Sequence, residues 1–422
     1  MNTKLNVAVA AALFAAASGA QAGITIPAGD WTLDIGGVVN AYYTNTRVSG
    51  EQTAGYATLT SGRGSQDALT GGGDFNRSQS NISTGLLPNY LSVSGKTRQN
   101  DLDVAFTISI NPGSSTTQAG IQNGQGNQEN RQAFLTFGDA SWGSIKLGKD
   151  LGIFASDAIL NDMTLLGVGG GAGGLAGNTT TLGRIGTGYV YADWKAQAAY
   201  TSPNWNGFQF TVGATQAFNA IDVGLNSAVS TNRGGSQPAF EGKASYEWTG
   251  DVAGKVWASF ISQKIEQLNN GATPTPVQLG GGSRVSAFDI GATVKVADFG
   301  LTGYYYDGRG IGQTVQMNGG YDITGKRRDS KGGYVQGTYT IPGVGTKLGV
   351  SWGQSKLEAN SGDAIAAGQV GKDLKDEMWT VGAYHPLTKH LNLVAEYSDV
   401  KSEVGSLEGK GKTIALGGIL FF

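Results

Sequence analysis

The sequence changes character within one stretch, Glu129 to Gly167, which reads ENRQAFLTFGDASWGSIKLGKDLGIFASDAILNDMTLLG. Its first two segments, Arg131 to Gly138 and Ser144 to Lys149, are short and rich in aromatic and β-branched residues. A short glycine-containing segment, Asp139 to Gly143, joins them, which is typical of a β-hairpin. The alternation then stops, and a long loop follows over residues 150–183. Because loops of that length in a compact fold are usually functional or disordered, we expect this one to fold back into a β-barrel and narrow its pore.

Composition excludes several classes of function. The chain has 422 residues, with 30 Lys and Arg against 32 Asp and Glu, so its charge gives no reason to expect a nucleic-acid partner. There is no cysteine, and the two histidines, His385 and His390, lie beside Pro386 in a turn-like segment. We therefore expect no disulfide, no metal site and no cofactor. The 69 glycines do not indicate disorder, because aromatic and β-branched residues are plentiful throughout.

The N-terminus has the three parts of a secretory signal peptide over residues 1–22. Lys4 supplies the positive charge, Val7 to Ala17 is apolar, and Ala20 to Ala22 is a small-x-small cleavage site. We place the cleavage after Ala22. The apolar part is too short to span a bilayer as a helix, and no later segment has 18 consecutive apolar residues. An exported soluble protein or an outer-membrane barrel remains.

Hydrophobic residues alternate with small or polar ones through much of the remaining chain, 23–422. The pattern is clearest in five segments: Trp31–Tyr43, Leu102–Ile110, Phe208–Thr215, Leu348–Trp352 and Leu391–Tyr397. A period of two residues places each apolar set on one face of a β-strand. A soluble β-sandwich also alternates, so the connections between strands decide the fold.

Short and long connections follow one another along the chain. Short turns are expected near residues 96–101, 202–207, 250–254, 297–300, 342–345 and 386–390. Long polar segments are expected near 47–86, 111–128, 150–183, 219–237, 267–283, 312–331, 359–374 and 404–410. This arrangement predicts a single transmembrane antiparallel β-barrel with short periplasmic turns and long extracellular loops. A pair of strands after each long segment gives about sixteen strands, with eighteen as the alternative.

The barrel must be closed, because hydrocarbon offers no partner to a free sheet edge. An outer face in contact with outer-membrane lipid needs an apolar band bordered by aromatic residues. We expect that border from Trp31, Tyr43, Trp142, Trp205, Phe208, Trp248, Trp352, Tyr384 and Tyr397. The last strand, Lys412 to Phe422, has an apolar face and ends on an aromatic residue, as a strand pairing with the first one would.

Three pieces of the sequence resemble the Gram-negative general porins. The hairpin Asn130–Phe137, with Ser141–Gly143 and Leu147–Lys149, resembles the porin segment that leads into the constriction loop. Tyr200-Thr-Ser-Pro-Asn-Trp-Asn-Gly-Phe208 resembles the family's Tyr-x-Ser-Pro…Gly-Phe turn. The terminal Phe422, after an export signal, resembles the signal read by the outer-membrane assembly machinery.

The resemblance implies a homotrimer of sixteen-stranded barrels in the cell outer membrane, each with a water-filled pore narrowed by its third loop. In that family, acidic residues on the loop face basic residues on the barrel wall. Arg131 matches a wall arginine, and Lys149 matches a basic position just before the loop. Asp157 and Asp162 are the acidic residues available on the loop.

Other positions make the expected basic wall thin. Tyr90 stands where the family often has a wall arginine, and Asp193 or Lys195 stands where another is expected. Arg98 and Arg184 are further candidates for the constriction. The sign of the ion selectivity therefore cannot be carried over from the family.

A barrel of this size predicts passive diffusion of ions and small hydrophilic solutes without covalent chemistry. One alternative is a substrate-specific channel, with Tyr304–Tyr306 and Lys326–Arg328 as part of a track along the pore. Another is an outer-membrane barrel enzyme, for which the two histidines give poor support. A third is a soluble surface protein. The Gly-rich run at residues 167–174 lacks the strand–helix context of a phosphate-binding loop.

Overall fold

The computed structural model describes residues 23–50, 77–114, 128–170, 180–221, 227–271, 276–279, 283–363, 373–405 and 407–422. The expected export signal at residues 1–22 and residues 171–174 of the Gly-rich run lie outside the described residues. Within these ranges no helix is long and apolar enough to cross a membrane.

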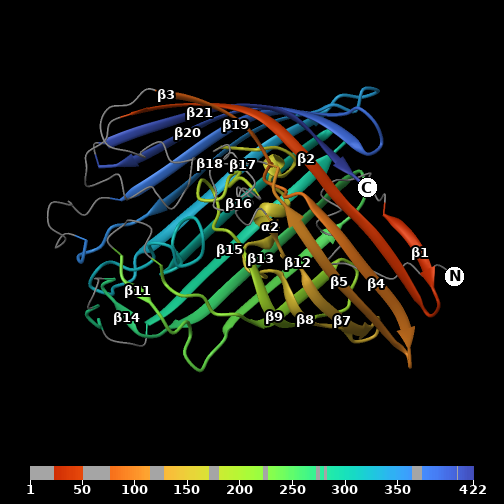
Figure 1. Cartoon of the computed structure of the whole chain (residues 1–422), viewed down its shortest axis with the longest axis horizontal. Helices are drawn as coiled ribbons and strands as arrows, with labels where there is room; N and C mark the ends of the chain where they lie inside the picture. Colours follow the sequence, from red (N-terminus) through yellow and green to blue (C-terminus); the bar gives the residue numbers. More distant parts are fainter. Residues whose placement is uncertain are drawn as a thin grey trace, which may run out of the picture.

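The described residues form one closed antiparallel barrel of sixteen strands, in which β3 and β4 together make a single interrupted strand. Its members are β2 (Trp31–Gly50), β3 (Arg77–Ser83), β4 (Tyr90–Gln99), β5 (Leu102–Pro112), β7 (Ala133–Asp139), β8 (Gly143–Leu151), β9 (Trp194–Thr201), β10 (Phe208–Thr215), β12 (Ala239–Trp248), β13 (Val252–Ile265), β15 (Ser283–Val296), β16 (Phe299–Arg309), β17 (Asp329–Thr340), β18 (Lys347–Leu357), β19 (Leu374–Pro386), β20 (Leu391–Val404) and β21 (Leu407–Phe421). Shorter pieces are β1 (Ile24–Ala28), β6 (Gln128–Glu129), β11 (Val229–Ser230) and β14 (Leu268–Asn269). The strands are tilted around the wall, as Figure 1 shows.

The first and last strands close the barrel. β2 pairs antiparallel with β21 from Val38 opposite Phe421 to Gly50 opposite Gly409. The backbone of Phe422 continues this pairing through Gly37, whose N–H donates to the Phe422 carbonyl at 2.7 Å. β1 then occupies the remaining part of the same β2 edge, with Ile24 opposite Ile35. The wall therefore has no open edge at this seam, as a sheet surrounded by hydrocarbon requires.

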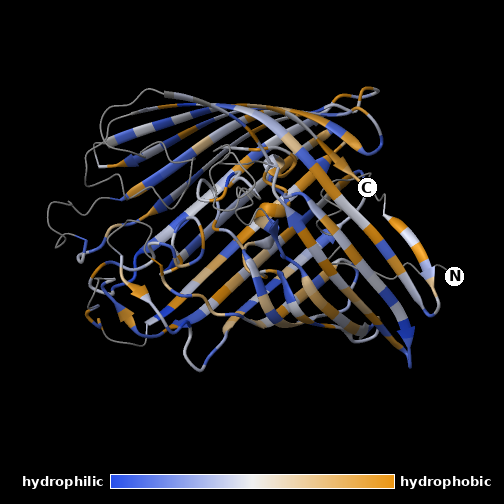
Figure 2. Cartoon of the chain, viewed as in Figure 1, coloured by the Kyte–Doolittle hydropathy of each residue, from blue (hydrophilic) through white to orange (hydrophobic). Residues whose placement is uncertain are grey.

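Side chains alternate between the two faces of the wall. On β18, Leu348, Val350 and Trp352 point outward and are 43%, 56% and 43% exposed, whereas Ser351 points inward and is buried. The same holds around the barrel, and Figure 2 shows it as alternating hydrophobic and hydrophilic bands along the strands. Outward apolar residues include Val39, Leu91, Ile108, Leu135, Leu147, Val212, Val256, Ile290, Leu301, Val335, Val350, Val381, Leu393 and Leu416. A continuous apolar belt of this kind is the lipid-facing surface of a membrane barrel.

Tight turns join the strands at one end, which we call the short-turn rim. Asn100 and Asp101 link β4 to β5, and their φ angles of 49° and 62° are those of a two-residue turn that suits the twist of a hairpin. The long connections lie at the opposite end, which we call the loop rim.

The expected all-β barrel of about sixteen strands is confirmed, but two details were wrong. Residues 404–410 are not a long loop, because β20 and β21 stay paired as far as Val404 opposite Leu407. The two strands extend beyond the apolar belt, and outward-facing ion pairs, such as Lys401 with Glu408 at 2.9 Å, link them in this part. The sequence here is as polar as that of a loop, which is why a loop was expected. Tyr384 is not a border aromatic: it points inward, is 2% exposed, and donates a hydrogen bond to Glu396.

Candidate functional site: the third loop and the facing wall

The third loop connects β8 to β9 and comprises residues 152–193, of which 152–170 and 180–193 are described. It contains the short helix α2 (Ser156–Leu160) and the 3-10 turn η2 (Met163–Leu166). Every residue from Gly152 to Ile159 is buried. Figure 1 shows α2 among the strands of the barrel rather than beyond the loop rim. The third loop forms hydrogen bonds with inward-facing residues of the barrel wall.

The inward-facing Glu241 of β12 fixes the start of the third loop. Its Oε2 accepts the backbone N–H groups of Ile153 and Phe154, both at 2.8 Å. Its Oε1 accepts the Lys195 ammonium at 2.6 Å and the Thr215 hydroxyl at 2.8 Å. Glu241 and Lys195 both have side chains with no solvent exposure. A buried carboxylate with four donors meets the requirement that a buried charge be paired and hydrogen-bonded.

A second carboxylate, Glu396 of β20, holds the loop beyond η2. Its Oε2 accepts the N–H groups of Val168 at 2.7 Å and Gly169 at 2.8 Å, and its Oε1 accepts the Tyr384 hydroxyl at 2.6 Å. A Cβ atom on Gly167 would collide with this carboxylate, so the close approach requires glycine there. The loop is therefore attached to the wall on both sides of its helical segment.

Gln336 and Tyr334 of β17 bind the middle of the loop. Gln336 accepts the Met163 N–H at 2.9 Å and donates to the Asn161 carbonyl at 2.6 Å. The Tyr334 hydroxyl donates to the Ala158 carbonyl at 2.8 Å. These bonds satisfy backbone groups at the ends of α2 and η2, which have no partner within the loop's own helical turns.

Asp157, in the first turn of α2, faces two wall lysines. Its carboxylate accepts the Lys243 ammonium at 3.0 Å and forms a second ion pair with Lys255. Burial by itself raises the pKa of Asp157, but the two lysine charges more than offset that effect and lower the pKa to about 2. Asp157 is thus a carboxylate at neutral pH, held between β12 and β13.

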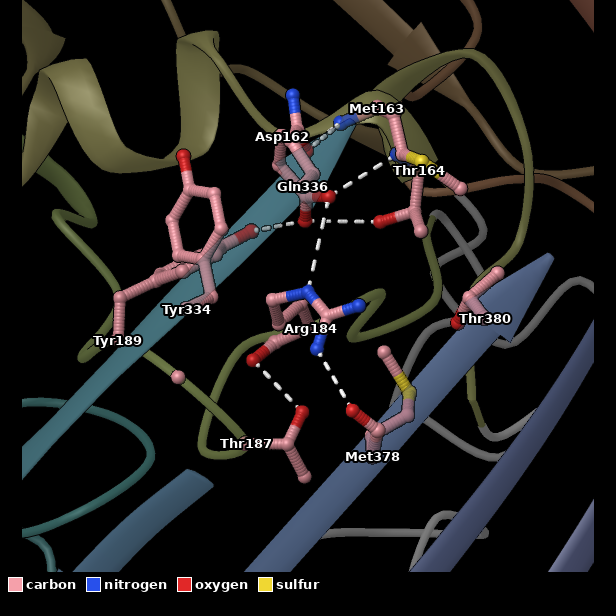
Figure 3. Close-up of polar contacts among 12 residues, drawn as sticks. Asp162, Met163, Thr164, Arg184, Thr187, Tyr189, Tyr334, Gln336, Met378 and Thr380 are labelled. Atoms are coloured by element: carbon pink, nitrogen blue, oxygen red, sulfur yellow. Dashed lines mark hydrogen bonds and ion pairs between the residues drawn. The ribbon is translucent and has the colours of Figure 1, made fainter. Parts of the chain in front are cut away.

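Asp162 and Arg184 are both engaged within the loop, as Figure 3 shows. Asp162 accepts the Thr164 N–H at 3.0 Å, the Thr164 hydroxyl at 2.8 Å and the Tyr189 hydroxyl at 2.9 Å. The Arg184 side chain has no solvent exposure; its Nε lies 3.9 Å from Asp162, and it donates to the Met378 carbonyl at 3.0 Å. This pair joins the two described parts of the loop, residues 152–170 and 180–193, and Arg184 attaches the second part to β19.

Arg131 and Lys149 lie together at the loop rim of β7 and β8. Arg131 is 5% exposed, donates to Glu129 at 2.9 Å, and packs 5.8 Å from the centre of the Trp194 ring. Lys149 occupies an outward position, two residues after Leu147, and donates to the Asn130 carbonyl at 2.8 Å. In the described part of the chain, neither Arg131 nor Lys149 contacts Asp157 or Asp162.

Three of the other expected residues are spread over the barrel. Arg98 lies at the short-turn rim and pairs with Asp103 at 3.0 Å and Asp139 at 2.9 Å. Asp193 ends the third loop, with a φ of 62°, and accepts the Trp194 N–H at 2.7 Å; burial raises its pKa. Phe422 takes part in the seam with β2.

The sequence reasoning missed the residues that hold the loop: Glu241, Glu396, Lys243, Lys255 and Gln336. A signal was present, because Glu241, Lys243 and Ser245 alternate with Phe240, Gly242 and Ala244. Charged residues at inward positions of a membrane strand have to face water or a partner inside the barrel. Choosing which of them meet the third loop needs the strand register, which spacing alone does not supply.

The chain is similar to known outer-membrane proteins in both sequence and structure. A model of Gram-negative porins matches residues 7–405. The outer-membrane channel DcaP of Acinetobacter baumannii has a TM-score of 0.62 at 14% identity, with 94% of this chain and 99% of that chain covered. OmpT of Vibrio cholerae, an outer membrane protein, has a TM-score of 0.54 at 14% identity, covering 94% and 100%.

Salmonella typhi OmpF, in a complex with daunomycin, has a TM-score of 0.53 at 16% identity, covering 93% of this chain and 100% of that chain. Comparison with curated proteins finds no match. At these identities the solved structures establish the shared barrel, and the family model covers nearly the whole sequence. The chain belongs to the Gram-negative porin family.

Proposed function

We propose that this porin forms a water-filled channel in the outer membrane whose narrowest part lies between the third loop and the barrel wall. Ions and small hydrophilic solutes would cross it by passive diffusion. The observation on which the proposal rests is the attachment of the loop to inward carboxylates on separate parts of the wall, Glu241 on β12 and Glu396 on β20. A loop held at both places extends across the interior of the barrel and reduces the cross-section open to solutes.

The charges at this level would decide which solutes pass. Lys243 and Lys255 on the wall remain 26% and 25% exposed while they pair with Asp157 of the loop, so charges of both signs border the opening at this level. Such an arrangement orients dipolar solutes and disfavours apolar ones. Asp162 and Arg184, by contrast, would keep the loop in shape, because both partners of this pair have side chains without solvent exposure, whereas the lysine partners of Asp157 are partly exposed.

The proposed function also requires export of the chain and its assembly in the outer membrane. Residues 1–22 would be removed as a signal peptide, the belt of apolar residues would contact outer-membrane lipid, and Phe422 would be read by the assembly machinery. We also propose a homotrimer, consistent with the trimer form reported for Vibrio cholerae OmpT. Membership of the porin family favours the passage of solutes over catalysis. Of the two histidines, His385 is on the outer face, and its Nδ1 lies 2.9 Å from the Thr346 hydroxyl oxygen.

A substrate-specific channel is the main alternative. Tyr304 and Tyr306 of the suggested track point inward but are buried, and Tyr305 points outward and is 43% exposed. Arg328 is bonded to Asp363, and the structure therefore gives the track less support than a general pore.

Single-channel recording in planar bilayers tests the proposal. The purified protein should produce discrete current steps whose size rises in proportion to KCl concentration, as a wide aqueous pore predicts. Proteoliposomes should also swell in sugars at rates that fall smoothly with sugar size. No current steps would refute the channel, whereas rapid swelling with one sugar among several of equal size would favour the substrate-specific alternative.

A further inference from the structure

Two lysines on the inner wall lie on the short-turn side of the third loop. Lys295 is the next-to-last residue of β15 and continues the inward-facing series of Ala287 and Asp289. Lys347 begins β18 and continues the inward-facing series of Gly349 and Ser351. Among the described residues, neither ammonium group forms an ion pair with a carboxylate. Lys347 instead lies 5.1 Å from the centre of the Tyr384 ring.

Between these lysines, β16 and β17 have no acidic residue at their inward positions; Asp298 lies in the exposed turn before β16, accepts the Thr340 N–H at 2.9 Å through its backbone carbonyl, and forms no ion pair with either lysine among the described residues. Strand register places Gly300 opposite both Lys295 and Thr338, and places Thr340 opposite Lys347. An added Cβ on Gly300 would meet only the Thr338 hydroxyl within 4 Å, so the surface next to Lys295 is open. The third loop borders the same patch, because the Met163 side chain packs over Gly349. The patch thus consists of two ammonium groups, threonine hydroxyls and glycines.

The carboxylates at the level of the loop are already engaged. Glu396 accepts two loop amides and the Tyr384 hydroxyl. Asp289 accepts the Ser259 hydroxyl at 2.7 Å and the Tyr304 hydroxyl at 3.0 Å. Asp157 is held by Lys243 and Lys255. None of them neutralises Lys295 or Lys347, and the two lysine charges act on each other. Like charges next to each other on the wall of an aqueous channel attract a counter-ion.

We propose that Lys295 and Lys347 form an anion-binding site on the short-turn side of the third loop, for small oxyanions such as phosphate or carboxylates. The ammonium groups supply the charge, and the threonine hydroxyls can donate hydrogen bonds to the same oxygen atoms. The inference rests on the proposed function, since a solute reaches this patch through the channel. Its consequence is a preference for anions over cations.

Reversal potentials across a KCl gradient test the site, with Lys295→Gln and Lys347→Gln introduced singly and together. The ratio of chloride to potassium permeability should fall about threefold for each lysine removed. Inorganic phosphate added to each side in turn should reduce the chloride current of the wild type, and the double variant should need several-fold more phosphate. The matched control is Lys401→Gln with Lys410→Gln, which removes the same charge from the outer face.

The outcomes separate this inference from the proposed function. A wild-type protein that conducts, with an unchanged permeability ratio and phosphate effect in the double variant, would overturn the anion site and leave the channel intact. A wild type without conductance would refute the channel itself. Because Lys347 packs on Tyr384, Lys347→Arg is a second variant that retains the charge and should retain the wild-type values, while the exposed Lys295→Gln avoids any effect on folding.

Discussion

At the scale of single residues, Glu241 combines structural and functional roles. It neutralises Lys195 and binds two amides at the start of the third loop. Both charged side chains are fully buried, so removal of one leaves the other without a partner in a medium of low dielectric constant. That loss costs about 3–5 kcal/mol in buried ion pairs.

We therefore expect Glu241→Ala to lower the free energy of unfolding by about 3–5 kcal/mol, measured by urea titration of the barrel in detergent. Its single-channel current should also become noisier, because the loop loses one attachment. Glu377→Ala is the control: Glu377 lies on the outer face beside Lys375 at 3.6 Å, and exposed pairs contribute at most about 1 kcal/mol. Equal losses in the two variants would contradict this role for Glu241.

The pKa of Asp157 gives a prediction of pH dependence. Its value of about 2 lies below the ordinary 3.8, so the ion pairs with Lys243 and Lys255 stabilise the loop fully above pH 3.8 and weaken as the pH falls through about 2. The difference corresponds to about 2 kcal/mol.

Between pH 7 and pH 4, the reversal potential attributable to Asp157 should stay constant. Asp157→Asn should shift it toward anions at pH 7, because two lysines then lack their carboxylate. A change centred near pH 4 in the wild type, absent from Asp157→Asn, would show that the lysines do not depress this pKa.

Part of the candidate site could be anticipated from the sequence, because Asp157, Asp162 and Arg184 are charged residues of the long loop, although their roles in conduction stay predictions. Asp157 and Asp162 were recognisable as the acidic residues of a long loop after a hairpin. The wall partners of Asp157 were not anticipated, because Lys243 and Lys255 lie far along the chain on strands that follow the loop. A pairing of that kind depends on strand register and loop path, which no local spacing encodes.

At the scale of elements, the alternation of each strand fixes which face meets lipid. On β18, Val350 lies in the apolar belt and is 56% exposed, whereas Ser351 next to it is buried inside. The strand ends are harder to predict because charged residues continue the ladder beyond the belt. Lys401 of β20 pairs with Glu408 of β21, and each has a second partner on its own strand, so β20 ends later and β21 begins earlier than polarity suggests.

Val350→Arg should therefore lower the free energy of unfolding from a bilayer by about 2–4 kcal/mol, the cost of arginine on the lipid face near the midplane. Folding into lipid vesicles, followed by urea titration, measures this difference. Lys356→Arg on the outer face of the same strand, beyond the belt, should change it by less than about 1 kcal/mol. Similar values for the two variants would mean that Val350 does not contact hydrocarbon.

At the scale of the whole molecule, closure of the wall and placement of the third loop are linked. Pairing of β2 with β21 removes the last free edge and sets the curvature that brings β12, β17 and β20 within reach of one loop. The barrel itself follows from period and connection lengths in the sequence. The position of the loop follows only once the ring is closed, so its attachments to β12, β17 and β20 could not be predicted from local sequence.

The most direct test of a channel narrowed by this loop uses the absence of cysteine in the chain. Asn161, which ends α2, is partly exposed, so Asn161→Cys places a single thiol on the loop. A charged, water-soluble methanethiosulfonate reagent should reduce the single-channel current in a clear step. Asp251→Cys, in the turn between β12 and β13, should show little change. A conducting channel whose current is unaffected by modification at residue 161 would contradict a path past the third loop.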